Sequence, residues 1–449
     1  MSLFQKIKTA WREDNLLRRV VRNSSLLSSS NIIAAGLSFI QGILVARMLD
    51  VDGLGTLTAI IAFATMINNI LSFRMSEVLV RHFNTAVAEG KNDQASAIAR
   101  GSGLAEAGIS IIAFGLLLLL APWAAKTFAK DTATAPFFAI YGVTILSNLF
   151  YETSRGILQA HRRFGKFAAV FLVQTILTFL LILGASIAGV RSIPFVLGAY
   201  IAGKTLAGIA IIVLAVRTLN ETLPGWQRVP LRTYTGWRSL FRFALSTNLN
   251  GTVNQLVRDN IPLYIAALTS TAGVGYFKIA LGFTSLLMLP IEPFIWPTYT
   301  EITSTIAEKA HATTRRLLRR VSLISTGWVL AVGGAVAALG WWLIPLLYGR
   351  QYAPAYPAVL ILLIGYGFAN IFGWNRPLLL ALGRPAFPLI NAALTGVIEL
   401  ALIFALVPRY GYLAAAAILS GYLVISICAN LLSGMRELKQ RQVEEGGQP

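Results

Sequence analysis

The chain alternates long hydrophobic stretches with short polar segments over almost its whole length. Most stretches hold about 20 residues, the number that an α-helix needs to cross the ~30 Å hydrocarbon core of a bilayer. They lie at about 26–46, 55–73, 104–123, 135–151, 167–188, 193–216, 243–268, 275–297, 321–343, 358–374, 387–406 and 412–432. This pattern predicts an all-α polytopic membrane protein with about twelve transmembrane helices.

Composition agrees with that prediction. Of the 449 residues, 56% are hydrophobic and only 13% are charged, whereas charged residues make up ~25% of ordinary soluble proteins. A soluble enzyme, a disordered chain, a disulfide-stabilised secreted domain and a coiled coil are therefore excluded. The single cysteine, Cys428, and three widely separated histidines offer no metal-ligand spacing, so we expect no cofactor and no metal site.

The basic residues are distributed unequally between alternate connecting segments. Lys and Arg number 38 against 19 Asp and Glu. With the N-terminus in the cytoplasm, 29 basic residues fall in cytoplasmic segments, six in outer segments and three inside apolar runs. The positive-inside rule then predicts that both termini are cytoplasmic, and it explains the basic excess without a nucleic-acid partner.

Several residues recur at a nearly constant separation, close to half the chain, which indicates an internal repeat. Gly53-Leu54-Gly55 is matched by Gly273-Val274-Gly275, Asn148 by Asn370 and Arg163 by Arg384. Because each half contains six runs, both halves cross the membrane in the same direction. We therefore predict two pseudo-symmetric six-helix lobes around a central cavity.

The expected organisation follows from this repeat and from the charged segments. It is a cytoplasmic amphipathic arm (1–24), an N-terminal lobe (25–216), a basic cytoplasmic linker (217–242), a C-terminal lobe (243–433) and a cytoplasmic tail (434–449).

Three basic residues, Lys204, Arg258 and Lys278, lie inside apolar runs. A charge near the bilayer centre costs ~2.5–3.5 kcal/mol on insertion scales, so such residues usually face a cavity or a partner. We expect Lys204 and Arg258 to line a cavity. For Lys278 the alternative, a side chain that extends to the membrane interface, is equally compatible with its position.

The seventh run is the most polar. Asn250, Asn254 and Arg258 share one helical face, and Gln255 and Asp259 lie on an adjacent stripe. In the first run, its repeat counterpart, Asn31 and Gln41 also occur at helical spacing. Two homologous polar helices predict the facing walls of one cavity, although close packing through small residues is an alternative for the first run.

Acidic and aromatic residues add two further groups of candidates. Asp259, Glu292 and Glu399 are candidates for binding a coupling proton or Na⁺, although Glu292 and Glu399 are also compatible with a structural role near a helix break. Tyr151 and Arg155 end the fourth run, and Trp374 and Arg376 end the tenth, at matched positions on the cytoplasmic side. These four residues are candidates for a cytoplasmic gate that binds a sugar phosphate, with interfacial anchoring as the alternative.

Residues Gly198 to Thr205 match the phosphate-binding pattern G-x-x-x-x-G-K-[ST]. A functional P-loop follows a strand and precedes a helix, whereas this match lies inside an apolar run. We therefore interpret its glycines as helix-packing residues and expect no nucleotide.

The chain resembles the Wzx-type oligosaccharide flippases, or polysaccharide transporters, of the multidrug/oligosaccharidyl-lipid/polysaccharide (MOP) superfamily, which also contains MurJ-like flippases and MATE exporters. The stretches that carry the resemblance are 46–55 (ARMLDVDGLG), 258–259 with 273–277 (RD and GVGYF), 290–301, 347–352 (LYGRQY), 380–384 (LALGR) and 408–411 (PRYG). A glycine is commoner in the family at Asp50, so we expect the outer turn there to differ.

The resemblance implies a V-shaped pair of six-helix lobes around a cationic central cavity, to which Arg47 could contribute. It also implies a transporter, not an enzyme, that moves an undecaprenyl-diphosphate-linked oligosaccharide from the inner to the outer leaflet of a bacterial cytoplasmic membrane by alternating access. The expected partners are this glycan lipid, membrane lipids and other polysaccharide assembly proteins.

Two alternatives stay open. A MATE-like or other secondary antiporter is the nearest, and a MATE-like cation exporter should have a net acidic cavity. A scaffold subunit of a polysaccharide export complex is the other. A membrane glycosyltransferase is disfavoured because every expected outer segment is short.

Overall fold

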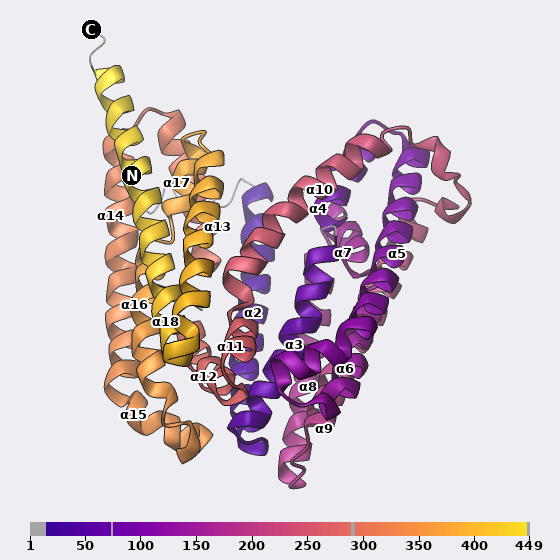
Figure 1. Ribbon diagram of the computed structural model, residues 1–449. Helices are drawn as coiled ribbons and strands as arrows, with labels where there is room; N and C mark the ends of the chain where they lie inside the picture. Colours follow the sequence, from indigo (N-terminus) through magenta and orange to yellow (C-terminus); the bar gives the residue numbers. More distant parts are fainter. Residues whose placement is uncertain (1–14, 73–74, 289–291, 447–449) are drawn as a thin grey trace.

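The protein folds as two helical lobes. A computed structural model describes residues 15–72, 75–288 and 292–446, with side chains described from Ile32 to Val443 except at 246–247, 249–251, 253–254 and 292–297. Within these residues the chain is almost entirely helical and has no strand. The two lobes form a V that is narrow at one end and wide at the other (Figure 1).

The first lobe and the connection after it contain the elements up to α10. They are α2 (Asn15–Met48), α3 (Val51–Leu71), α4 (Met75–Ala88), α5 (Asn92–Ala124), η1 (Ala125–Ala129), η2 (Thr132–Thr134), α6 (Ala135–Ser147), α7 (Tyr151–Ala160), α8 (Phe164–Ile187), α9 (Ile193–Thr222), η3 (Trp226–Arg228), η4 (Leu231–Thr233) and α10 (Trp237–Asn254).

The second lobe contains the remaining elements. They are η5 (Gln255–Asp259), α11 (Ile261–Leu268), α12 (Thr271–Met288), α13 (Glu292–Ala307), α14 (His311–Trp328), η6 (Val329–Gly333), α15 (Gly334–Tyr348), η7 (Arg350–Tyr352), α16 (Ala355–Ile371), α17 (Asn375–Ala381) and α18 (Ala386–Gly446).

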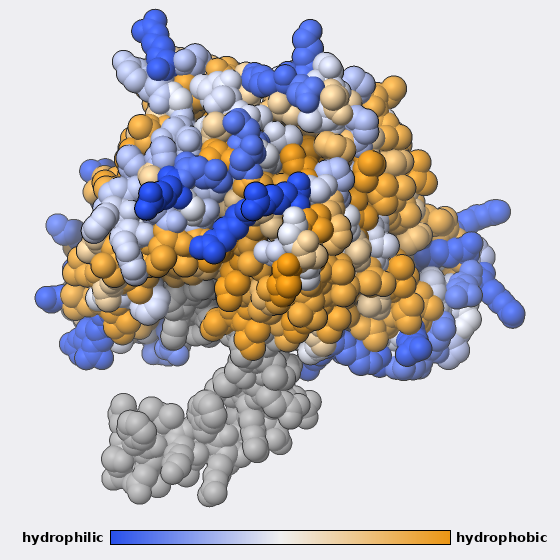
Figure 2. Space-filling view, turned by 90° about the horizontal axis from the view of Figure 1, so that it is seen from below, coloured by the Kyte–Doolittle hydropathy of each residue, from blue (hydrophilic) through white to orange (hydrophobic). Residues whose placement is uncertain are grey.

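Nine helical stretches of the described residues are long and apolar enough to span a membrane. This number differs from the twelve predicted runs for three reasons. The first run is represented by the shorter helix Ile32–Met48, the seventh is divided into α10, η5 and α11, and the last two share α18. Hydrophobic side chains cover much of the face seen from the narrow end, with hydrophilic side chains in separate groups (Figure 2). The chain is a multi-pass membrane protein.

Helix boundaries follow local chemistry at two informative positions. Asp50 is the N-cap of α3, where its Oδ1 accepts a hydrogen bond from the Gly53 N–H at 2.7 Å. An aspartate in place of the commoner glycine thus supplies a side-chain cap. Gly411, with φ 62° and ψ −149°, interrupts α18 just after Pro408, and only glycine adopts this backbone conformation without strain. The break separates the two last predicted spans.

Reciprocal contacts at the lobe junction confirm the repeat. Gly55 of α3 lies so close to α12 that a Cβ would be 1.8 Å from the Thr271 carbonyl oxygen. Gly275 of α12 lies against the Val51 carbonyl, which would be 2.4 Å from a Cβ. In the repeat, Thr271 is the counterpart of Val51, and Gly275 is the counterpart of Gly55. Each of the two contacts therefore has an equivalent in which the roles of the lobes are swapped. A two-fold axis produces the same relation in an isologous interface.

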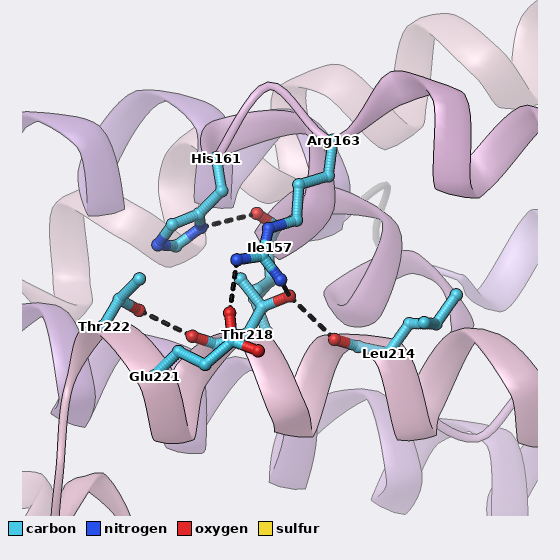
Figure 3. Close-up of polar contacts among 7 residues, drawn as sticks. All are labelled: Ile157, His161, Arg163, Leu214, Thr218, Glu221 and Thr222. Carbon is cyan, nitrogen blue, oxygen red and sulfur yellow. Dashed lines mark hydrogen bonds and ion pairs between the residues drawn. The ribbon is translucent and has the colours of Figure 1, made fainter.

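A second matched pair of contacts lies at the wide end. Arg163, between α7 and α8, pairs with Glu221 near the end of α9 (Figure 3). Arg384, its repeat counterpart, pairs with Glu437 of α18 at 2.7 Å. The residue before each arginine has a positive φ. Equivalent loops in the two lobes thus have the same turn and the same type of ion pair to a neighbouring helix.

The connection between the lobes packs against the first lobe. Arg100 of α5 donates to the Val229 carbonyl at 3.0 Å, and Tyr234 hydrogen-bonds to His82 Nδ1 at 3.3 Å. Burial raises the pKa of the Tyr234 phenol above its ordinary value, which keeps that hydroxyl protonated. The predicted linker 217–242 is therefore held in place by α4 and α5.

Helix α10 crosses from this connection toward α11 (Figure 1). Leu240, Ala244 and Asn248, spaced four residues apart, are buried, and Asn248 Nδ2 donates to the Ile70 carbonyl of α3 at 2.9 Å. The following η5 contacts α18 of the second lobe. Residues 243–254, which the sequence assigns to the C-terminal lobe, thus pack on α3 and α4 of the first.

Candidate functional site

A polar cavity of about 600 Å³ lies on the inner side of the first lobe, and we call it the N-lobe cavity. Amide, hydroxyl, charged and aromatic side chains line it together with two residues of η5. The lining residues are Asn68, Asn69, Ser72, Ser76, Glu77, Glu106, Ser110, Asn148, Tyr151, Glu152, Arg155, Gln159, Phe171, Gln174, Lys204, Gln255 and Asp259.

Five residues predicted from the sequence meet in this cavity: Lys204, Gln255, Asp259, Tyr151 and Arg155. They come from three separate elements, α7, α9 and η5. Gln255 also links the lobes, because its Oε1 accepts a hydrogen bond from Asn69 Nδ2 of α3 at 2.8 Å.

Lys204 is the distinctive cation of the cavity. Its Nζ lies 5.4 Å from the centre of the Tyr141 ring, a distance suited to a cation–π contact. No hydrogen bond or ion pair joins it to any residue that the structure describes. The ammonium is therefore available to an anion in the cavity.

A buried acidic residue that the sequence analysis missed, Glu106, holds the start of helix α7, which carries the gate candidates Tyr151 and Arg155. Glu106 is 7% exposed, and its two oxygens accept the backbone N–H groups of Glu152 and Thr153, each at 2.8 Å. Acceptor oxygens at this point satisfy two of the N–H donors that a helix N-terminus leaves free. The available signal was an acid three residues into an otherwise apolar run.

The side chains of α7 are held by a second set of contacts. Glu152 accepts a hydrogen bond from Ser76 Oγ at 2.5 Å and pairs with Arg155 at 3.5 Å. The Arg155 guanidinium also lies 5.3 Å from the centre of the Phe167 ring. Arg155 therefore enters the cavity with its charge partly balanced.

The resemblance implied a cationic central cavity, whereas acidic side chains outnumber basic ones in the lining of the N-lobe cavity. Its lining contains four acidic side chains, Glu77, Glu106, Glu152 and Asp259, and two basic ones. The sequence analysis counted charges only in the middle of apolar runs. Folding also brings Glu77 of α4, Glu106 of α5 and Glu152 of α7 into the cavity, so that acidic side chains outnumber basic ones there.

Four predicted binding residues lie elsewhere. Arg258 is exposed and 5.9 Å from the centre of the Tyr366 ring, and Lys278 is exposed on α12; neither lines the N-lobe cavity. Gln41 is buried in α2. Arg47 lies at the narrow end, where it donates to the carbonyls of Leu347 and Leu346 at 2.7 and 2.5 Å.

Glu399 occupies a separate and mostly apolar pocket of about 260 Å³ between the two halves of α18. The side chain is 2% exposed, and neither carboxylate oxygen has a hydrogen-bond partner among the described residues. Glu399 is therefore a buried acid without a local neutralising hydrogen bond.

The predicted gate residues of the second lobe do not join the N-lobe cavity. Trp374 is buried, and its Nε1 donates to Ser322 Oγ of α14 at 2.8 Å. Arg376 is exposed. The side chains of Asn31, Asn250, Asn254 and Glu292 lie outside the described residues.

Residues Gly198–Thr205 lie inside α9, in one continuous helix. A Cβ at Gly203 would be 2.1 Å from Thr178 Oγ1 of α8. This glycine therefore allows α8 and α9 to approach closely, as expected for a packing residue.

The narrow end is closed by side chains that donate to backbone carbonyls across the lobes. Lys130 Nζ donates to the Ala267 carbonyl at 2.7 Å, and the Tyr352 hydroxyl donates to the Ala46 carbonyl at 3.0 Å. In the repeat, Tyr352 is the counterpart of Lys130, and Ala267 is the counterpart of Ala46. Corresponding segments of the two lobes thus clasp each other at this end.

Comparison with known proteins places the chain in a family. A family model described as polysaccharide biosynthesis protein matches residues 20–298, more than half of the chain. The inner membrane protein YghQ of Escherichia coli (strain K12) is 23% identical over 363 residues, which cover 78% of this chain and 98% of that protein.

Two solved structures show the same fold. The lipid II flippase MurJ in an inward closed conformation aligns with a TM-score of 0.71 and 15% identity over 93% of this chain and 90% of that one. An inward-facing multidrug resistance MATE family transporter of the MOP superfamily aligns with a TM-score of 0.70 and 13% identity, over 95% and 100% of the two chains. The fold is that of MOP transporters, and the chain belongs to the polysaccharide biosynthesis protein family.

Proposed function

We propose that this protein is a flippase that moves a polyprenyl-diphosphate-linked saccharide from the inner to the outer leaflet of a bacterial cytoplasmic membrane by alternating access. The observation that carries the proposal is the N-lobe cavity with the unpaired Lys204 ammonium on its wall. A polar, charged hollow among membrane-spanning helices is costly unless it holds water or cargo.

The lining groups suit both parts of such a cargo head group. Lys204 can bind diphosphate oxygens through charge-assisted hydrogen bonds, which are stronger than neutral ones. Amides such as Asn148 and Gln174 can bind sugar hydroxyls, and the faces of Tyr151 and Phe171 can contact the apolar C–H surface of a sugar ring. The lipid tail stays in the bilayer beside the lobes.

The conformation supports alternating access. The segments rich in basic residues, including the connection before α10 and the start of α14, lie at the wide end (Figure 1), which the positive-inside rule assigns to the cytoplasm. The narrow, clasped end then faces outward. Flipping an anionic head group outward is favoured by ~2.3 kcal/mol per charge per 100 mV in an inside-negative cell. Asp259 and Glu399 are the candidates for binding a coupling cation.

Transport by reconstituted protein tests the proposal. Proteoliposomes would hold a fluorescent polyprenyl diphosphate disaccharide, and its appearance in the opposite leaflet would be measured with a quencher that does not cross the bilayer. We expect Lys204→Glu to lower the initial rate at least about tenfold, the loss of one charge-assisted bond, while the exposed Lys126→Glu at the narrow end keeps the wild-type rate. A Lys204→Glu protein that is folded and fully active would contradict the role of the cavity.

The acidic excess of the cavity favours a second candidate, a MATE-like antiporter for organic cations. In that case the same proteoliposomes would accumulate a fluorescent organic cation when a proton or sodium gradient is imposed, and would leave the saccharide lipid in its original leaflet. Transport of the saccharide lipid with no cation accumulation would exclude this second function.

A further inference from the structure

The charges of the N-lobe cavity are not equally available to a cargo. Glu106 is occupied by two backbone N–H groups, and Glu152 and Arg155 neutralise each other. Lys204 and Asp259 line the cavity without a hydrogen bond or an ion pair to any residue that the structure describes. The cavity therefore presents one unpaired cation and one unpaired anion.

These two groups stand on different walls. Lys204 belongs to α9, deep in the first lobe, beside Tyr141. Asp259 belongs to η5, which contacts the second lobe. We assign the diphosphate to Lys204, because it is the unpaired cation of the cavity. The saccharide then contacts the remaining lining, which includes Asp259 and the amide groups.

That remaining surface is unsuited to a negatively charged sugar. It contains six amides, at Asn68, Asn69, Asn148, Gln159, Gln174 and Gln255, and the carboxylates of Glu77, Glu106, Glu152 and Asp259. Amides and carboxylates accept hydrogen bonds from sugar hydroxyls and from ammonium groups. A sugar carboxylate would be repelled by the unpaired Asp259 carboxylate, which disfavours binding of an acidic sugar.

Resting on the function proposed above, we infer that the saccharide carried by this protein is free of carboxylate groups: its sugars are neutral or bear amines, not uronic or other acidic sugars. Lys204 recognises the diphosphate common to all such lipids, and the unpaired Asp259 carboxylate selects against acidic glycans. Selectivity of this kind is negative, because it comes from repulsion of the wrong cargo.

Binding of three matched probes to the purified full-length protein tests the inference. The probes share one polyprenyl chain and one diphosphate, and carry a disaccharide that ends in glucose, glucosamine or glucuronic acid. Each competes with a fluorescent glucose-ended probe. We expect the glucuronic acid probe to bind at least about tenfold more weakly than the glucosamine probe, and the difference to shrink as salt is raised.

Variants connect the preference to the cavity. Asp259→Asn keeps the side-chain shape and should reduce, several-fold, the difference in affinity between the glucosamine and glucuronic acid probes. Asp259→Lys should reduce this difference further. Glu308→Gln, an exposed acid on the loop after α13 and outside the cavity, should leave the difference unchanged. Size-exclusion profiles show whether each variant is folded.

The outcomes separate the inference from the function beneath it. If the glucuronic acid probe binds as tightly as the others, the inference is wrong while the flippase function stands. If the Asp259 variants prefer the glucosamine probe over the glucuronic acid probe as strongly as the wild type does, Asp259 does not select against acidic sugars. The inference is then also wrong. If no probe binds, the proposed function itself fails.

Discussion

The regions around α7 and α17 occupy matched places in the two lobes but use their polar groups in opposite ways. In the first lobe, Asn148 and the side chains of α7 line a cavity. In the second, Asn370 Nδ2 donates to the Leu287 carbonyl at 2.7 Å. Asn375, Asn430 and Asn391 form a buried chain of amide hydrogen bonds, at 2.9 and 3.0 Å.

This difference shows that matched polar groups have different roles in the two halves of the repeat. Satisfied buried amides stabilise and specify the packing of a helix bundle, whereas groups that face a hollow remain free to bind. We interpret the second lobe as the more rigid partner and the first as the cargo-binding one. Four pairs of variants can break or sharpen this comparison.

The largest effect is expected where the lobes are alike, at the glycines of the junction. Gly55→Val and Gly275→Val each place atoms on a backbone carbonyl of the opposite lobe, and overpacking of this kind typically costs ~1–3 kcal/mol. Both should open the narrow end, so that spin labels at Lys126 and Arg350 move apart. Gly108→Val, where nothing lies within 4 Å of a Cβ, is the control, and an unchanged label distance would argue against a tight junction.

The next effect separates the lobes. Glu106→Ala leaves the first N–H groups of α7 without their side-chain cap, a loss of ~0.5–2 kcal/mol at a helix N-terminus. Misplaced gate side chains should then lower transport about tenfold. Asn430→Ala should lower the thermal stability of the protein but leave transport per folded molecule nearly unchanged. Equal losses of transport in the two variants would show that the second lobe contributes to transport as much as the first.

A smaller effect is expected at the gate arginines. Arg155→Ala removes a cation from the cavity wall and should reduce the initial transport rate several-fold. Arg376→Ala changes an exposed residue outside the cavity and should leave the rate at its wild-type value. A rate that falls equally for Arg376→Ala would restore the symmetric gate predicted from the repeat.

The smallest effect is expected at the matched ion pairs of the wide end, because partly exposed pairs contribute little. Arg163→Gln should lower the melting temperature slightly more than Arg384→Gln, since Arg163 also donates to Thr218 Oγ1 at 2.8 Å (Figure 3). Thermal unfolding of the two purified variants measures both melting temperatures. A larger decrease for Arg384→Gln than for Arg163→Gln would contradict the contribution of the Thr218 hydrogen bond.

Much of the architecture could be predicted from the sequence because its signals are long and repeated. Apolar runs of bilayer length specify spans, and a nearly constant separation between matched residues specifies two lobes. The position of Lys204 on a cavity wall agrees with the expectation for a charge in an apolar run, whereas Arg258, for which the same was expected, lies outside the N-lobe cavity.

The rest of the site depends on contacts that a single sequence does not encode locally. Asn148 and Asn370 are the same residue type at matched positions, yet one lines the cavity and the other bonds to α12. Glu106 gains its role only when α7 is folded against α5. Arg47, predicted as a cargo ligand, instead finds carbonyl acceptors at the end of α15, because helix C-termini offer unpaired C=O groups.

Helix α10 carries a consequence for how the two lobes can move. It starts on the first lobe, ends at η5 beside the second, and has 18 residues, so as a straight rod it measures ~27 Å. A helix of this length does not stretch, so a movement of the second lobe relative to the first has to bend the ends of α10 or separate it from α3 and α4.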